Sequence, residues 1–236
     1  MIQKIALIII CSFFVLSCQD KQSKPKENQI QSSKVTKNKN TKADTIADKK
    51  PEFPFLTDSL AMEFFLEYEK THKENKVRIT TKFGDIDILL YDKTKFHRAN
   101  FIYLTKRGYF DNTQFYRVID NFIIQAGNTD DPKVKRKRGK IGRYLLPKDT
   151  KRGYKHDRGA VSMPSSDIEN PYKLASPYEF FIVQQQGGAH HLDGDYTIFG
   201  TVIKGMDVVD EIAKQKTDDG DWPLRNVYIQ KVEIIE

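Results

Sequence analysis

The clearest pattern of apolar and polar positions is the stretch 115–127, which reads FYRVIDNFIIQAG. Two short apolar runs flank Asp120-Asn121, and both of these side chains tolerate left-handed backbone, so the pattern predicts a β-hairpin. A cation, Arg117, and an amide, Gln125, interrupt the runs. Such groups on a largely apolar wall cost free energy unless something bonds to them. The pair therefore predicts a partner, which is either protein or ligand.

Other elements follow from apolar periods along the chain. Alternation or short apolar runs predict strands at 77–81, 86–91, 159–163, 179–184, 197–203 and 226–235. A period near 3.6 residues predicts helices at 59–73, 97–107 and 206–214. Gly84-Asp85 is expected to turn the chain, and a shift in apolar spacing after Ile229 predicts a β-bulge. Strands joined mainly by hairpins favour a mainly β fold, a closed antiparallel barrel, over a βαβ sheet.

The segment 128–158 shows no such period and is dense in lysine and arginine. The missing period predicts a long irregular loop there. Loops of this length are usually functional or mobile. A solvated surface loop is the default interpretation. A basic patch for an acidic partner and a membrane-facing patch are the alternatives.

The N-terminus has the pattern of an export signal. One lysine precedes an apolar core, 5–16, that is too short to span a bilayer as a stop-transfer helix. The core ends at Val15-Leu16-Ser17-Cys18, which resembles the bacterial lipobox, so Cys18 is expected to carry lipid and to anchor the protein in the cell envelope, periplasmic or surface-exposed. The alternative is an ordinary buried cysteine at the end of an anchor helix.

Charge and cysteine content refine this interpretation. The segment 19–50 is polar, rich in lysine and without aromatic residues, so it predicts a disordered tether. The formal net charge of +7 resides mostly there, and residues 51–236 keep about +1, so nucleic-acid binding is not implied. Cys11 would leave with the signal and Cys18 would be lipidated. No thiol would remain for a disulfide, a zinc site or a nucleophile.

Motifs of conventional catalysis are missing from the sequence, which has no GxSxG, no Walker loop and no HExxH. His190 and His191 are adjacent rather than at helical ligand spacing, and Asp193-Gly194-Asp195 is typical of a turn. We therefore expect neither a metal nor a cofactor.

The central stretch resembles the signature of cyclophilin-type peptidyl-prolyl cis-trans isomerases, in which F-x-R-V-I, a two-residue turn, F-x-x-Q and a glycine form the floor of the active site. Further motifs follow in the family's order from about Lys76 onward. They are Gly84-Asp85-Ile86 with Asn100-Phe101, then Gly108-Tyr109-Phe110, Gly159-Ala160-Val161-Ser162-Met163, Glu179-Phe180-Phe181-Ile182 and Leu192-Asp193-Gly194-Asp195-Tyr196-Thr197-Ile198-Phe199-Gly200. The resemblance implies a closed eight-stranded antiparallel barrel capped by two α-helices, here with an extra N-terminal helix.

The resemblance also implies roles for individual residues. Arg117 would be the catalytic arginine, and Gln125 would hold the substrate backbone. The remaining residues implied to bind substrate are Phe122, Ile123, Phe181 and Leu192 in the proline pocket, His191 and Tyr196 at its rim, and Met163 and Glu179. The expected division of the chain is a signal at 1–17, lipidated Cys18 and tether at 18–55, a helical extension at 56–75 and the isomerase domain at 76–236.

The sequence departs from the family pattern on one side of this site. Glu179 stands where the family usually has glutamine, and a polar insert, 164–177, precedes it. His191 replaces a frequent tryptophan, Tyr196 a frequent histidine, and Ile123 the usual methionine. The last exchange conserves volume and should be tolerated.

Together these features predict a monomeric peptidyl-prolyl isomerase that acts on proline-containing segments of unfolded, exported proteins. Rotation about an X-Pro bond breaks no covalent bond, so no nucleophile, base or metal is needed. The alternative is a chaperone or scaffold module on a membrane anchor that binds proline peptides with little turnover. Glu179 and the altered loop favour the module. The residues that favour the enzyme are the intact Arg117, Phe122, Gln125 and Phe181.

Overall fold

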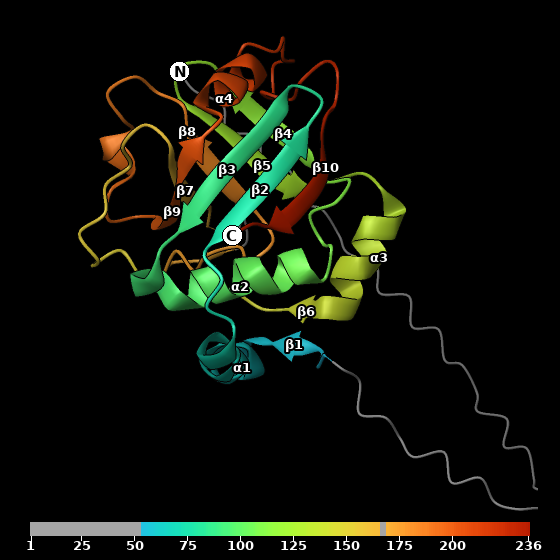
Figure 1. Ribbon diagram of the computed structural model, residues 1–236, viewed down its shortest axis with the longest axis vertical. Coiled ribbons are helices and arrows are strands. Elements are labelled where there is room, and N and C mark those ends of the chain that lie inside the picture. Colours follow the sequence, from blue (N-terminus) through green and yellow to red (C-terminus); the bar gives the residue numbers. More distant parts are fainter. Residues whose placement is uncertain (1–52, 166–168) are drawn as a thin grey trace, which may run out of the picture. The chain divides into compact units, whose positions relative to one another are not determined.

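The structure is a computed structural model that describes residues 53–165 and 169–236 (Figure 1). The expected signal, the lipidation site Cys18 and nearly all of the expected tether lie outside the described residues. Within the described ranges, no helix is long and apolar enough to cross a membrane.

Eight antiparallel strands close into a barrel in the order β10-β2-β3-β9-β7-β8-β5-β4. Their bounds are β2 Lys76–Thr81, β3 Gly84–Leu90, β4 Gln114–Ile119, β5 Ile123–Asn128, β7 Ala160–Met163, β8 Phe180–Val183, β9 Thr197–Lys204 and β10 Val227–Ile234. The predicted mainly β barrel is therefore confirmed. The predicted bulge is present too, because the β10–β2 register shifts between Ile229 and Lys231.

The barrel interior is filled by side chains from alternate strand positions. Val77 and Ile79 of β2 are fully buried, whereas Lys76, Arg78 and Thr80, which alternate with them, are partly exposed. Aromatic rings fill the middle of the core, where Phe101 stacks on Phe110 at 4.6 Å and meets the edge of Phe180 at 5.5 Å. The core thus fixes which face of each strand points outward.

Two helices lie at opposite ends of the barrel in Figure 1, α2 (Lys95–Lys106) at one end and α4 (Met206–Ala213) at the other. They match the predicted helices within two residues at each end. At the end of α2, Gly108 adopts a positive φ of 56°, which suits the expected helix stop.

The extra N-terminal helix is α1 (Asp58–Thr71), which packs against α2. Phe65 of α1 meets Tyr103 of α2 edge to face at 5.7 Å. β1 (Leu56–Thr57) pairs in parallel with β6 (Gly142–Arg143) in a two-stranded sheet that is separate from the barrel. The extension therefore packs as part of the folded domain.

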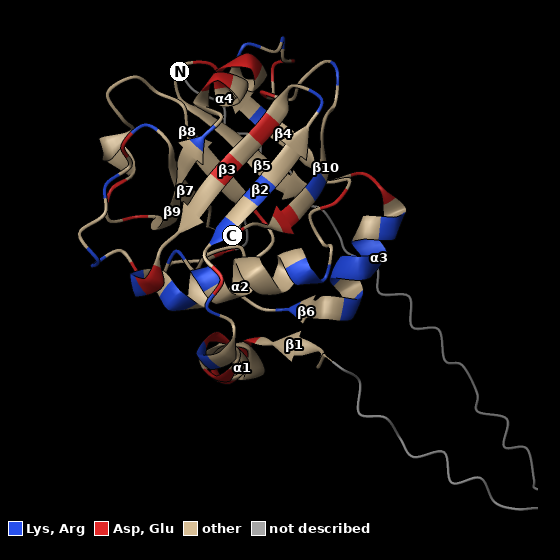
Figure 2. Cartoon of the chain, viewed as in Figure 1, with Lys and Arg blue, Asp and Glu red and all other residues tan. Residues whose placement is uncertain are grey.

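Two local predictions were wrong. The segment expected to be an irregular loop contains α3 (Pro132–Ile141), which starts with proline at its first turn and with Asp131 Oδ1 accepting a hydrogen bond from Lys133 N at 2.7 Å. Its cations colour most of this helix blue in Figure 2. The turn expected at Gly84-Asp85 lies two positions earlier, at Lys82-Phe83, because Gly84 already pairs with Thr81 as the first residue of β3.

Candidate active site

The outer face of the barrel carries a second group of apolar side chains, separate from the interior. Along β8, Phe180 and Ile182 belong to the interior, whereas Phe181 and Val183 point outward. We call the outward group the outer cluster. Its members are Ile123, Ala160, Phe181, Val183, Ala189 and Ile198, with Tyr91, Phe122, Tyr154, Leu192 and Tyr196 packed against them. Five of the predicted pocket and rim residues are thus brought together.

Ring contacts shape the rim of the outer cluster. Leu192 and the exposed His191 lie in the short 3₁₀ helix η2 (His190–Leu192). The His191 ring stacks on Phe122 at 5.4 Å, and Tyr196 meets the edge of Phe181 at 5.8 Å. The imidazole therefore covers one side of the apolar surface, and the phenol borders another.

Arg117, Gln125 and Phe181 form a row across three neighbouring strands. Arg117 on β4 lies opposite Gln125 on β5, and Gln125 lies opposite Phe181 on β8. Side chains that lie directly opposite in antiparallel strands share one face of the sheet. The row therefore places a cation, an amide and an aromatic ring side by side at the edge of the outer cluster.

Both polar members of this row have protein partners. Arg117 Nε donates to Asp221 Oδ2 at 3.3 Å, and Gln125 Nε2 donates to the hydroxyl of Tyr116. The Arg117 side chain stays 41% exposed. Among the described residues, none accepts a hydrogen bond from its Nη1 or Nη2. The outer fork of the guanidinium therefore remains available to a ligand.

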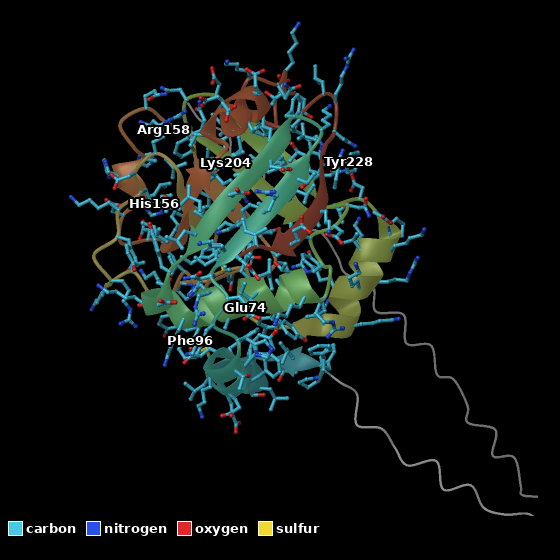
Figure 3. All side chains as sticks on the ribbon, viewed as in Figure 1. Glu74, Phe96, His156, Arg158, Lys204 and Tyr228 are labelled. Atoms are coloured by element: carbon cyan, nitrogen blue, oxygen red, sulfur yellow. The ribbon has the colours of Figure 1, made fainter. Side chains whose placement is uncertain are left out.

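The buried ring of His156 stacks on the ring of Phe181. The His156 ring lies parallel to Phe181 at 5.9 Å, and its Nδ1 lies 2.8 Å from Asp193 Oδ1. Figure 3 labels His156 at the left of the barrel. Burial lowers the pKa of His156, although Asp193 pulls in the opposite direction. Nε2 lies 3.2 Å from Ser162 Oγ, so the three residues have the order of a Ser-His-Asp triad. Ser162 is fully buried on β7 and cannot meet a substrate, so this network orients the floor of the site.

Two predicted binding residues are not members of the outer cluster. Met163 is 1% exposed and belongs to the barrel interior. Glu179 immediately precedes β8, and its charge raises the pKa of Tyr109, against the larger effect of Arg138, while burial makes the largest contribution. The contact of Glu179 with substrate stays a prediction.

The described part of the insert 164–177 reaches the rim. Lys173 Nζ pairs with Asp195 Oδ2 at 2.6 Å and lies 5.9 Å from the centre of the Tyr196 ring. Ala175 forms bridges with both Leu146 and Ser165, and the second bridge joins the two ends of the insert. The insert therefore borders the same surface as the predicted rim.

Some residues of the site had no signal in the sequence pattern. Asp221 and Trp222 come from the loop between α4 and β10, and Trp222 packs on Tyr116 at 5.8 Å. His156 lay in the segment expected to be an irregular loop. Its position three residues before the glycine of a family motif was the one clue available. In 53–165 and 169–236, no group of three or more His, Cys, Asp or Glu residues could hold a metal ion.

A family model described as cyclophilin type peptidyl-prolyl cis-trans isomerase/CLD matches residues 76–234. The chain is 37% identical over 161 residues to peptidyl-prolyl cis-trans isomerase CYP18-1 of Arabidopsis thaliana, across 67% of this chain and 94% of that protein. It is 36% identical over 170 residues to peptidyl-prolyl cis-trans isomerase-like 2 of Rhizopus delemar, across 71% of this chain. The match spans 30% of the length of that second relative.

Solved structures agree with these matches. A cyclophilin type peptidyl-prolyl cis-trans isomerase of Cryptosporidium parvum has a TM-score of 0.57 and 28% identity, covering 69% of this chain and 98% of that chain. A second structure, determined in the presence of the dipeptide Ala-Pro, has a TM-score of 0.56 and 30% identity, over 68% of this chain and 99% of that chain. The barrel, the outer cluster and these matches together assign the chain to the class of peptidyl-prolyl isomerases. The chain belongs to the cyclophilin-type family of that class.

Proposed function

We propose that this chain catalyses cis-trans isomerisation of X-Pro bonds in exported polypeptides. The observation that carries the proposal is the row of Arg117, Gln125 and Phe181 beside the outer cluster. The apolar surface around Phe181 suits a pyrrolidine ring, and the amide of Gln125 suits the adjoining peptide backbone. The related structure was determined in the presence of the dipeptide Ala-Pro. We propose that this chain likewise binds a proline-containing peptide.

The residues match what this reaction needs. The barrier of roughly 18–20 kcal/mol is the loss of amide resonance during rotation. As resonance is lost, the prolyl nitrogen becomes pyramidal and basic, so a donor that bonds to it stabilises the twisted amide more than the planar one. The fork of Arg117 is such a donor, and a guanidinium stays protonated at any working pH.

The test is the exchange rate between cis and trans forms of a proline peptide, measured by NMR. Wild type should accelerate exchange, and Arg117→Ala should lower the catalysed rate by about 10²- to 10³-fold, the usual loss when one transition-state donor is removed. Arg136→Ala, which removes an exposed cation of α3, is the control and should behave as wild type. A wild-type chain that leaves exchange unchanged would defeat the proposal.

A second candidate is a proline-peptide-binding chaperone or scaffold module with little turnover. The position of the insert favours it, because Lys173 and Asp195 form an ion pair at the rim beside Tyr196. The same NMR samples separate the two functions. Peptide shifts on binding without faster exchange would support the module and contradict the enzyme.

We also propose that Cys18 carries a lipid that holds the protein on a membrane of the cell envelope, periplasmic or surface-exposed. The support is the sequence Val15-Leu16-Ser17-Cys18 after a short apolar core. Folding outside the cytoplasm is limited by slow proline isomerisation, so an isomerase placed there has substrates. Cys18→Ala should move the protein from the membrane pellet to the supernatant. Equal membrane binding of both forms would contradict the anchor.

A further inference from the structure

The loop between α4 and β10, residues 214–226, lies directly against the strand that carries Arg117. Val118 N on β4 donates to the backbone oxygen of Asp221 at 2.9 Å. The Asp221 side chain, from the same residue, accepts from Arg117 Nε at 3.3 Å. Two contacts, one from the backbone and one from the carboxylate, therefore fix the loop to consecutive residues of β4.

Asp221 is held in place by its own loop. Its backbone has a φ of +64°, in the left-handed region that aspartate and asparagine tolerate better than most residues. Asp221 N donates to Asp218 O at 3.1 Å, and Asp218 Oδ1 accepts from both Gly220 N and Trp222 N at 2.9 Å. The bridge between Thr217 and Pro223 closes the loop at its base. The backbone that carries the Asp221 carboxylate is therefore held without help from Arg117.

The contact of Asp221 with Nε determines how the guanidinium of Arg117 is oriented. A guanidinium is planar and rigid, with donors on Nε, Nη1 and Nη2, so a bond at Nε sets the orientation of the whole fork. A free arginine side chain has about 2 kcal/mol of rotamer entropy, part of which must be lost when it acts on a substrate. An arginine already fixed at Nε loses less of that entropy at the moment of reaction.

The same loop supports the second polar member of the row. Trp222 packs on the Tyr116 ring at 5.8 Å, and the Tyr116 hydroxyl accepts from Gln125 Nε2. Asp221 and Trp222 are adjacent in sequence. Asp221 contacts Arg117 directly, and Trp222 contacts Tyr116, the partner of Gln125. The loop therefore approaches both side chains that would bond to the substrate backbone.

We propose that Asp221 is a positioning residue that orients Arg117, so that Nη1 and Nη2 face the prolyl amide. This inference rests on the proposed isomerase function and adds a residue to it. Asp221 bonds to Arg117 and not to the substrate. Its removal should therefore lower the rate of isomerisation on the protein more than it weakens peptide binding.

The test uses Asp221→Asn and Asp221→Gly, because both residues accept the left-handed backbone and neither carries a charge. NMR exchange at saturating peptide measures the isomerisation rate on the protein, and a peptide titration measures Kd. Both variants should lose roughly tenfold in rate, below the 10²-fold that a 1 Å misplacement can cost, with Kd changed less than about twofold. Asp219→Asn, an exposed neighbour in the same loop, is the matched control and should keep the wild-type rate.

The decisive comparison repeats these changes in Arg117→Ala. If Asp221 acts through Arg117, Asp221→Asn has no further effect there. An equal loss in both backgrounds, or a wild-type rate for Asp221→Asn and Asp221→Gly, would overturn the role of Asp221 while leaving the isomerase intact. A wild-type chain without activity would instead overturn the proposed function, and this inference with it.

Discussion

Arg117, Gln125 and Phe181 have their functional value because each points away from the barrel interior. Their neighbours Val118, Ile124 and Ile182 point inward and are buried in the core. The two-residue period of a strand separates these roles within a few ångströms. A shift of one residue in strand register would bury the cation and expose the core. The core residues beside the site therefore fix its geometry as firmly as its hydrogen bonds do.

His97 is a residue whose burial predicts an effect of pH. It is 1% exposed on α2, neither ring nitrogen has a hydrogen-bond partner among the described residues, and burial lowers its pKa from 6.5 to about 3. Below pH 6.5 His97 binds a proton in the unfolded chain but stays neutral in the folded chain. The free energy of unfolding therefore falls as pH drops toward 3. The slope approaches about 1.4 kcal/mol per pH unit for this group.

We therefore expect His97→Leu to reduce the loss of stability between pH 6.5 and 5. Urea denaturation of both forms at pH 7.5, 6 and 5 gives the comparison. His156, whose pKa burial also lowers, contributes in the same direction and remains in both proteins. The prediction is wrong if the two forms lose stability in parallel across that range.

One buried cation links helix α1 to the domain, in addition to the ring contacts with Tyr103. Arg98 on α2 is 1% exposed, and its Nη2 donates to Glu69 Oε2 of α1 at 3.2 Å. Nη1 reaches the backbone oxygens of His72 and Glu74, each at 3.4 Å. Asp92 Oδ1 lies 3.5 Å from Arg98 Nε but is exposed, so Glu69 is the shielded carboxylate of the two. A buried guanidinium that loses such a partner is costly because it has lost contact with water. The N-terminal helix thus supplies a carboxylate that pairs with a buried cation of the barrel domain.

We expect Glu69→Gln to lower the free energy of unfolding by about 1–3 kcal/mol, the usual range for a hydrogen bond to a charged group. Glu67→Gln makes the same change of charge on the same helix, at an exposed ion pair with Lys70. That pair should contribute less than about 0.5 kcal/mol. Urea midpoints of the two variants decide the matter, and equal losses would mean that the Arg98 contact does not hold α1.

For the molecule as a whole, the sequence predicts the barrel well because the apolar period recurs in every strand. It misses α3 because Val134 and Ile141 are the buried residues of that helix, seven positions apart among cations. It misses Asp221 for a different reason. The contact with Arg117 joins residues 104 positions apart. The pattern predicts that Arg117 needs a partner, but no local pattern marks Asp221 as that partner. Predictions from period and motif therefore reach the strands and the central hairpin, but not the loop that approaches the hairpin from the other end of the chain.

Trp222 is the single tryptophan of the chain, and it is partly buried beside Tyr116, the partner of Gln125. Indole emission responds to the polarity and rigidity of its surroundings. A proline peptide that bonds to Gln125 would disturb the ring beneath the indole, so the protein carries its own fluorophore next to the place where substrate would arrive. Binding can therefore be followed by intrinsic fluorescence in the unmodified protein, separately from any measurement of turnover.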